Sequence, residues 1–231
     1  MKILQLILLI SLAGCGNQYK GNSFEEFGIV GGRRVADSRD AVYRSTIAII
    51  SNGRVICTGT LIGQNQVVTA AHCLGSITHV GHGFYGGKNM QRVISSTRYP
   101  NYRVDLAVIR FSGSMGREVR PVPLAPVPRY GRVTIAGYGT TRERARNSGY
   151  LRKTTSSIGQ VYGHEFTLRR DGKGACYGDS GGPAFIGSRG RLSLVGVTSR
   201  EGASGTCNAG DGVFTSIYVF KDWLRRTASR Y

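Results

Sequence analysis

Three separate segments of this chain carry a hydroxyl, an imidazole and a carboxylate that could act as one catalytic unit. Ser180 stands in the glycine-rich segment 178–183 (GDSGGP), His72 precedes a cysteine, and Asp105 stands at the head of the apolar run 106–109. A hydroxyl nucleophile needs a base to take its proton, and the base needs a carboxylate that fixes its tautomer and stabilises the imidazolium. The chain order His, Asp, Ser is one of three orders known for this constellation. The three segments therefore predict nucleophilic catalysis by Ser180.

Each of these residues also has a plainer interpretation when it is taken alone. Ser180 could belong to a glycine-rich turn, and Asp105 could cap a strand end. His72 could be a structural histidine beside a disulfide, with its ring nitrogens hydrogen-bonded. Their occurrence together, in this order, favours the catalytic interpretation.

Further landmarks accompany the three segments. Residues 29–32 read IVGG, Cys57 and Cys73 enclose the histidine segment, residues 136–140 read AGYGT, and Trp223 lies in a closing segment. From Ile29 to the C-terminus, the chain resembles the chymotrypsin/trypsin family of serine endopeptidases. The resemblance implies an all-β fold of two antiparallel six-stranded β-barrels with a short C-terminal helix. It also implies peptide-bond hydrolysis through an acyl-enzyme, protein or peptide substrates, a monomer, and no metal or cofactor.

The composition independently favours many short strands and a sizeable core. Glycine accounts for 34 of the 231 residues, and short β-branched runs recur between turn residues, which is typical of antiparallel strands. The clearest runs are 45–50, 67–70, 106–111, 132–136 and 192–198.

Other segments are expected to organise the domain of residues 29–231. Only residues from about 216 to 226 have the apolar spacing of a helix. The prolines of 121–128 suggest a connector, so we place the boundary between the two barrels near 121–130. The remaining histidines fit no metal-ligand or catalytic pattern and are interpreted as loop residues: His79, His82 and His164.

The family resemblance also implies how the cysteines pair. Four of the five match the family's paired positions, Cys57 with Cys73 and Cys176 with Cys207. Such bridges indicate an oxidising compartment, a periplasm or the exterior. Cys15 is left without a partner, so it calls for another partner or a modification.

The N-terminus predicts export. In residues 1–14, Lys2 is followed by the apolar run 3–10, which is typical of a signal peptide and short for a membrane span. Residues 12–15 (LAGC) resemble a bacterial lipoprotein processing box, which would leave Cys15 N-terminal and lipidated. The alternative is an ordinary secretory signal with an incidental cysteine. We expect an outer-membrane lipoprotein precursor and, after activation, a periplasmic or extracellular enzyme.

The resemblance assigns further roles around the serine. The backbone N–H groups of Gly178 and Ser180 would bind the oxyanion. Asp179, if buried beside the site, needs a cation, which the family supplies as the new α-ammonium of Ile29. Residues 15–28 would then be the lipidated activation peptide of a zymogen that is nearly inactive until it is cleaved before Ile29. Phe27-Gly28 precedes Ile29 where the family commonly has Lys or Arg, so another kind of activating protease, or none, would act.

Six positions correspond to the family's specificity pocket: Gly174, Ser199, Arg200, Glu201, Asp211 and Gly212. Gly174 puts no anion at the pocket base, where trypsin-like enzymes carry an aspartate. Arg200 replaces an aromatic wall, and Glu201 is expected to intrude on the pocket mouth. These residues favour small or apolar side chains at the cleavage position, whereas Glu201 and Asp211 are the features that favour a cation.

The chain is strongly basic, with a net charge of +18 that is unchanged from Ile29 onward because residues 1–28 hold two lysines and two glutamates. Such a surface is expected to adhere to phosphates, anionic lipids or acidic proteins. The basic residues are scattered and not clustered with aromatics, which argues against a specific nucleic-acid module. The competing hypothesis is a catalytically idle protease homologue that binds anionic surfaces.

Overall fold

The computed structural model describes residues 29–83, 87–169, 171–188, 190–207 and 210–229. The predicted signal peptide (1–14) and activation peptide (15–28), including Cys15, lie outside the described residues. Within the part that is described, no helix is long and apolar enough to cross a membrane.

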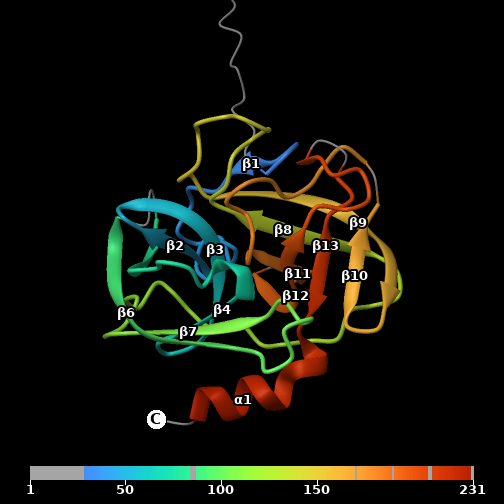
Figure 1. The fold of residues 1–231 in the computed structure, drawn as a ribbon. Helices are drawn as coiled ribbons and strands as arrows, with labels where there is room; N and C mark the ends of the chain where they lie inside the picture. The colour runs from blue at the N-terminus through green and yellow to red at the C-terminus, as the bar shows by residue number, and fades with distance from the viewer. Residues whose placement is uncertain (1–28, 84–86, 170, 189, 208–209, 230–231) are drawn as a thin grey trace, which may run out of the picture.

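The described residues form short strands and a few helical turns (Figure 1). The strands are β1 (Arg33–Arg34), β2 (Thr46–Ser51), β3 (Arg54–Gly63), β4 (Gln66–Thr69), β5 (His79–His82), β6 (Lys88–Arg98), β7 (Ala107–Phe111), β8 (Arg132–Gly137), β9 (Arg152–Tyr162), β10 (Glu165–Leu168), β11 (Pro183–Ser188), β12 (Arg191–Arg200) and β13 (Val213–Ser216). The helical elements are the 3₁₀ turns η1 (Ala71–Cys73) and η4 (Tyr218–Phe220) and the helix α1 (Lys221–Ser229).

The first barrel is formed by the N-terminal half of the domain. Its strands close in the order β2-β3-β4-β7-β6-β5, and every pairing is antiparallel. Ile47, Val67, Ile109 and Phe111 are fully buried in its core. Because the barrel is closed, its short strands leave no sheet edge with unpaired backbone N–H and C=O groups.

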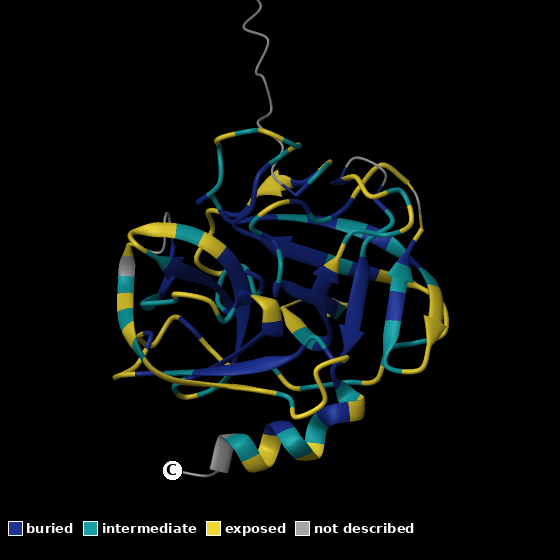
Figure 2. Ribbon diagram, viewed as in Figure 1, coloured by how far each residue is buried: buried dark blue, intermediate teal, exposed yellow. Residues whose placement is uncertain are grey.

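The second barrel follows the same principle. A sheet in the order β1-β9-β10-β13-β12-β11-β8 closes through the β8–β9 pairing, so β8 to β13 form a six-stranded barrel and β1 adds to β9. Phe166 stacks on Phe214 in its core, with ring centroids 5.2 Å apart. Buried strands of both barrels meet at the centre of the molecule (Figure 2). The predicted fold class is confirmed.

Two features tie the barrels together. Residues 112–131 connect β7 to β8, and the segment 121–130 predicted as the boundary lies within this connection. The helix α1 follows the second barrel but returns to the first, where Trp223 packs edge-on against Tyr99 with ring centroids 5.2 Å apart.

Some local predictions were wrong. The helix begins at Lys221 and not near residue 216, because Val213–Ser216 completes the second barrel between β10 and β12. His79 and His82 are not in a loop but in β5, where Nε2 of His82 lies 2.7 Å from the carbonyl oxygen of Tyr43. His164 lies in the turn between β9 and β10, as predicted.

Candidate active site

His72 and Asp105 come together because the strands beside them are paired. β4 and β7 run antiparallel, with Thr69 opposite Ala107. His72 lies in η1, just after β4, and Asp105 stands two residues before β7. The end of one strand therefore meets the beginning of the other, and both side chains reach the same edge of the first barrel.

The Asp105 carboxylate is engaged by three donors. Oδ2 lies 2.8 Å from Nδ1 of His72 and accepts a 2.7 Å hydrogen bond from the Ser199 hydroxyl, while Oδ1 accepts the His72 amide at 3.0 Å. Burial by itself raises the pKa of Asp105, but the hydrogen bonds from His72 and Ser199 outweigh it and lower that pKa below its usual value. The ionised carboxylate accepts, so Nδ1 of His72 carries the proton and Nε2 is left as the base.

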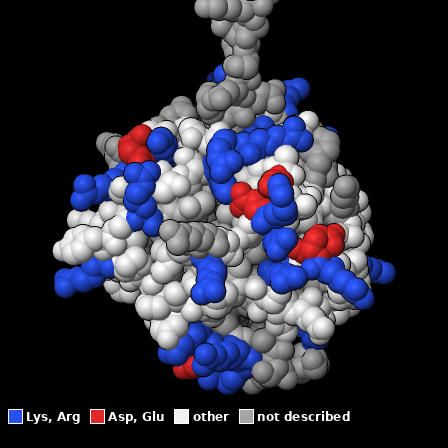
Figure 3. Space-filling model, turned by 180° about the vertical axis from the view of Figure 1, so that it is seen from behind, with Lys and Arg blue, Asp and Glu red and all other residues white. Residues whose placement is uncertain are grey.

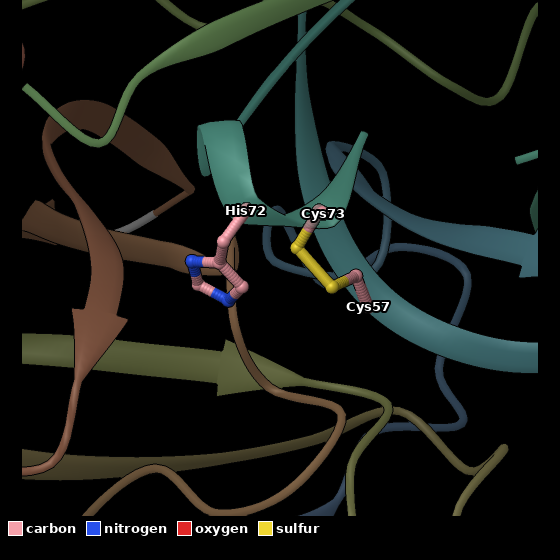
Figure 4. Close-up of side chains that lie close together, drawn as sticks. All are labelled: Cys57, His72 and Cys73. Carbon is pink, nitrogen blue, oxygen red and sulfur yellow. A yellow bond between two sulfur atoms is a disulfide. The ribbon is translucent and has the colours of Figure 1, made fainter. Parts of the chain in front are cut away.

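A disulfide anchors the turn that carries His72. Cys73 is bonded to Cys57 of β3, with Cα atoms 6.1 Å apart, and the imidazole hangs beside this bridge (Figure 4). Potential ligand atoms of Cys57, His72 and Cys73 lie within 4.8 Å of one another. Because the two sulfurs are bonded to each other, they offer no thiolate, and this group is a structural anchor for the histidine and not a metal centre. The second predicted bridge, Cys176–Cys207, is also formed.

The serine turn belongs to the second barrel but docks on the first. The amide of Thr58 in β3 donates a 2.8 Å hydrogen bond to the carbonyl of Ser180. Gly178 and Gly181 have positive φ angles of 91° and 79°. A Cβ on Gly181 would lie 2.0 Å from Oγ1 of Thr69, so only glycine allows this contact. Ser180 is thereby fixed at the junction of the barrels, half-buried.

Asp179, the residue before Ser180, is fully buried. Its Oδ1 accepts the amide of Gly139 at 2.8 Å, and its Oδ2 accepts the amide of Cys176 at 2.9 Å. Burial raises the pKa of Asp179 to about 7, although both amides and the charge of Arg152 oppose the rise.

Ile29 lies in the core of the second barrel. It is 1% exposed and belongs to the hydrophobic cluster around Ile135. The following residue, Val30, forms a bridge with Gly174, whose amide donates to the Val30 carbonyl at 3.2 Å.

A cavity of about 230 Å³ adjoins Ser180. Four of the predicted pocket residues line it: Arg200, Glu201, Asp211 and Gly212. The other two are placed differently. Gly174 is buried behind the wall, where a Cβ would lie 2.9 Å from Cα of Gly210, and Ser199 directs its hydroxyl to Asp105.

Hydrogen bonds fix two charged side chains of the cavity wall. The Arg200 guanidinium binds both carboxylate oxygens of Glu165 in β10, at 2.5 and 2.8 Å. Asp211 accepts the hydroxyl of Ser204 at 2.7 Å and its amide at 3.2 Å. Asp211 is therefore held by its own loop, while Arg200 is drawn toward β10.

Sequence reasoning missed three residues that support the site. Thr58 donates its hydroxyl to the Gly178 carbonyl at 2.8 Å and accepts the Tyr138 amide at 3.0 Å. Ser199 was assigned to the pocket and not to Asp105. Arg152 is buried, and its charge lowers the pKa of Asp179, but the run RKTTSS that begins β9 is polar on both faces and gives no signal that residue 152 points inward.

Comparison with known proteins identifies the family. The sequence profile of the trypsin family matches residues 29–224, most of the chain. The chain belongs to the trypsin family. It is 30% identical over 230 residues to trypsin of Saccharopolyspora erythraea, covering 85% of this chain and 96% of that protein. It is 28% identical over 211 residues to trypsin-1 of Salmo salar, covering 79% of this chain and 85% of that protein.

The same similarity extends to other trypsin-like proteases. Cathepsin G of Mus musculus is 27% identical over 237 residues, covering 90% of this chain and 88% of that protein. The solved structure of mouse neuropsin superposes with a TM-score of 0.72 at 24% identity, covering 87% of this chain and all of that one, a likeness of fold. Family membership makes this trypsin-family protein a serine endopeptidase.

Proposed function

We propose that this trypsin-family endopeptidase hydrolyses peptide bonds through Ser180, His72 and Asp105. The observation that carries the proposal is the His72–Asp105 contact of 2.8 Å at the junction where the Ser180 turn docks. His72 would take the proton of the Ser180 hydroxyl as Oγ attacks the substrate carbonyl carbon. The resulting oxyanion would be bound by the N–H groups of Gly178 and Ser180, for which the positive φ of Gly178 suits the turn.

The second half of the reaction follows by proton balance. Protonated His72 would give its proton to the leaving amine as the C–N bond breaks, which leaves an acyl-enzyme on Ser180. Water, deprotonated by the same imidazole, would then attack the ester and release the acid. Asp105 stays ionised throughout, orients the ring and stabilises its charged form.

Serine-directed labelling tests this assignment. We expect a fluorophosphonate to label wild type at Ser180, and Ser180→Ala to lose both the label and peptide hydrolysis while remaining folded. Ser96→Ala, at an exposed serine of β6, is the matched control and should label like wild type. An activated wild type that neither labels nor hydrolyses peptides would favour the alternative, an idle homologue that binds anionic surfaces.

For substrate choice we propose neutral, small or apolar side chains at the cleavage position. Gly174 brings no charge, and Asp211 and Arg200 are each held by other side chains. Burying an unpartnered cation is unfavourable. Glu201 is the residue of the wall that opposes this proposal. A peptide-library cleavage profile decides it: a strong preference for Arg or Lys, lost on Asp211→Asn or Glu201→Gln, would refute the proposal and identify the anion.

We further propose that the protein is a zymogen that cleavage before Ile29 switches on, because the new α-ammonium of Ile29 would supply the cation that the buried Asp179 needs. The burial of Ile29 in the second barrel and the bridge between Val30 and Gly174 support this proposal. A protease that accepts Phe27-Gly28 would be needed.

The disulfides and the trypsin-like relatives fit an exported protein. Beyond that, we propose that Cys15 carries lipid and holds the precursor on a membrane, and that cleavage before Ile29 also releases the enzyme. Basic side chains are spread over the face in Figure 3 with few acidic ones, which supports weak, salt-sensitive adhesion of the released domain to anionic surfaces.

A further inference from the structure

Another cavity, of about 550 Å³, lies where β1, β8 and β9 meet in the second barrel (Figure 1). It shares no residue with the cavity beside Ser180. None of the described residues that line it is acidic, and four are cationic: Arg33, Arg132, Lys153 and Lys173. A hollow lined by one sign of charge concentrates ions of the opposite sign, so this cavity attracts anions.

The strand register places the lining of this cavity on one face of the sheet. Across the antiparallel ladders of β9, Arg33 lies opposite Lys153, and Thr134 lies opposite Thr155. Side chains of directly opposed residues leave the sheet on the same side, as do residues two apart in one strand. These four side chains therefore share the outer face, because the intervening residue Ile135 is buried in the barrel core.

Most of the positive charge of the cavity is not neutralised. Lys153 forms an ion pair with Asp40. Arg33 and Lys173 are exposed, and their side chains form no ion pair within the part of the chain that the structure describes. The exposed Arg132 donates from Nη2 to the carbonyl of Thr155 at 3.3 Å, and this neutral oxygen positions the guanidinium without removing its charge.

A carboxylate near Lys173 is already engaged elsewhere. Asp171 accepts the Ser156 hydroxyl and the backbone amide of Lys173, each at 3.1 Å, and it does not line the cavity.

Two hydroxyl groups stand between the cations. Thr134 and Thr155 are half-buried, and their hydroxyls form no hydrogen bond to any residue that the structure describes. An ionised phosphate has several strong acceptor oxygens, so it can accept an arginine fork and a neutral hydroxyl at the same time. Cations around free hydroxyl donors therefore match the chemistry of phosphate.

The spacing of the cations favours more than one phosphate group. Arg33 lies opposite Lys153, whereas the guanidinium of Arg132 reaches Thr155, two residues further along β9. Two residues of a strand span roughly 7 Å, and side chains stand nearly perpendicular to the sheet. The two guanidinium groups thus serve neighbouring phosphates better than a single one.

We propose that this cavity binds an anion with two or three linked phosphate groups, with Arg33 and Arg132 at its two ends, the hydroxyls of Thr134 and Thr155 between them, and Lys173 at the rim. The site is a single saturable one, unlike the diffuse adhesion expected of the whole basic surface. It does not depend on the proposed role of Ser180.

Isothermal titration calorimetry with tripolyphosphate tests the site, on the purified full chain with Ser180→Ala to prevent self-digestion. The variants are Arg33→Gln, Arg132→Gln, both together, and Thr155→Val. Arg54→Gln is the matched charge control, since Arg54 is the exposed first residue of β3 as Arg132 is of β8. Thr97→Val, at an exposed threonine of β6, is the hydroxyl control. Thermal unfolding verifies that each variant is folded.

We expect one tripolyphosphate to bind per molecule, and orthophosphate to bind more weakly. Arg33→Gln and Arg132→Gln should each weaken binding by about fivefold, the upper range for an exposed ion pair. Together they should weaken it by about 25-fold, because they hold different phosphates. Thr155→Val should weaken it by about tenfold, the scale of a hydrogen bond to a charged group, although it changes no charge. Both controls should bind like wild type.

Vesicles that carry lipids with phosphate monoester headgroups distinguish two sources of the same chemistry. Competition with tripolyphosphate would assign the cavity to a lipid headgroup, and lack of competition would assign it to a soluble phosphate chain.

Three results would overturn the inference. The first is tripolyphosphate binding that does not saturate at one per molecule. The second is an unchanged affinity in Thr155→Val, or an equal loss in Arg54→Gln and Arg132→Gln, either of which indicates diffuse adhesion. The third is equally tight binding of a glutamate oligopeptide of the same net charge, which would show that the cavity does not select phosphate.

Discussion

Ser199 and His72 bind the same oxygen of Asp105. The Ser199 hydroxyl donates to Oδ2 at 2.7 Å, and Nδ1 of His72 lies 2.8 Å from that atom. Ser199 stands in β12 of the second barrel, whereas Asp105 precedes β7 of the first. A hydroxyl from one barrel thus stabilises the ionised carboxylate that orients the imidazole of the other.

Ser199→Ala should lower kcat/KM by roughly tenfold, the usual cost of one hydrogen bond to a charged group. Asp105 would lose a donor, so its pKa should rise toward the usual value of a carboxyl, and the weaker hold on the imidazole should lower kcat/KM throughout the pH range in which Asp105 stays ionised. Steady-state kinetics between pH 5 and 8 measure this loss. Ser193→Ala, in the same strand, is the control. An unchanged kcat/KM would show that the Ser199 bond does not support the base.

Gly137→Ala should destabilise the fold and reduce labelling of Ser180, because the new Cβ would lie 2.1 Å from Oδ1 of Asp179. Overpacking of this kind typically costs about 1–3 kcal/mol. Urea unfolding and fluorophosphonate labelling measure the two losses. Gly75→Ala is the matched control, since a Cβ there meets nothing within 4 Å. Equal stability of the two variants would contradict the close packing of Gly137 on Asp179.

The uncleaved chain should lose stability as the pH rises from about 4 to about 7. In this window folded Asp179, whose pKa is raised to about 7, keeps a proton that the unfolded chain releases. The slope from this one group is at most about 1.4 kcal/mol per pH unit. Asp179→Asn should remove that part of the slope, whereas Asp222→Asn, at an exposed position of α1, should not. Urea unfolding at pH 4, 5.5 and 7 measures it, and parallel slopes for wild type and Asp179→Asn would contradict the prediction.

Cys15→Ser should convert a membrane-bound precursor into a soluble one. Acyl chains contribute about 0.8 kcal/mol per buried CH₂, so two or more chains hold a protein on a membrane in high salt. After cleavage before Ile29, the wild-type domain should leave the membrane once salt screens its positive charge. Fractionation at low and high salt measures this. Wild-type precursor that is soluble at low salt would remove the lipoprotein proposal.

Features that depend on local motifs could be predicted from this sequence. The strands around 45–50, 67–70 and 132–136 repeat β-branched residues between turns, and the two disulfides follow from the family pattern, so these predictions were confirmed. The start of α1 was misplaced because pairing of β13 with β10 and β12 outweighs the local helix-like spacing.

The long-range contacts of the site could not be predicted from the sequence. The bond from Ser199 to Asp105 joins residues 94 positions apart, and Thr58 reaches Gly178 across 120 positions. No local pattern marks either partner. Arg152 was overlooked for a related reason, since a cation at the start of a strand reads as exposed until the register with Gly137 shows which side it faces.

The proposed catalytic groups are divided between the two halves of the molecule, and this division would make the enzyme safe to synthesise. A chain in which only the first barrel has folded holds His72 and Asp105 without the Ser180 turn, which depends on strands of the second. A chain in which only the second barrel has folded has the serine without its base. On the proposed mechanism, hydrolysis therefore begins only when both halves have folded and docked, so that a partly folded copy cannot cleave its neighbours.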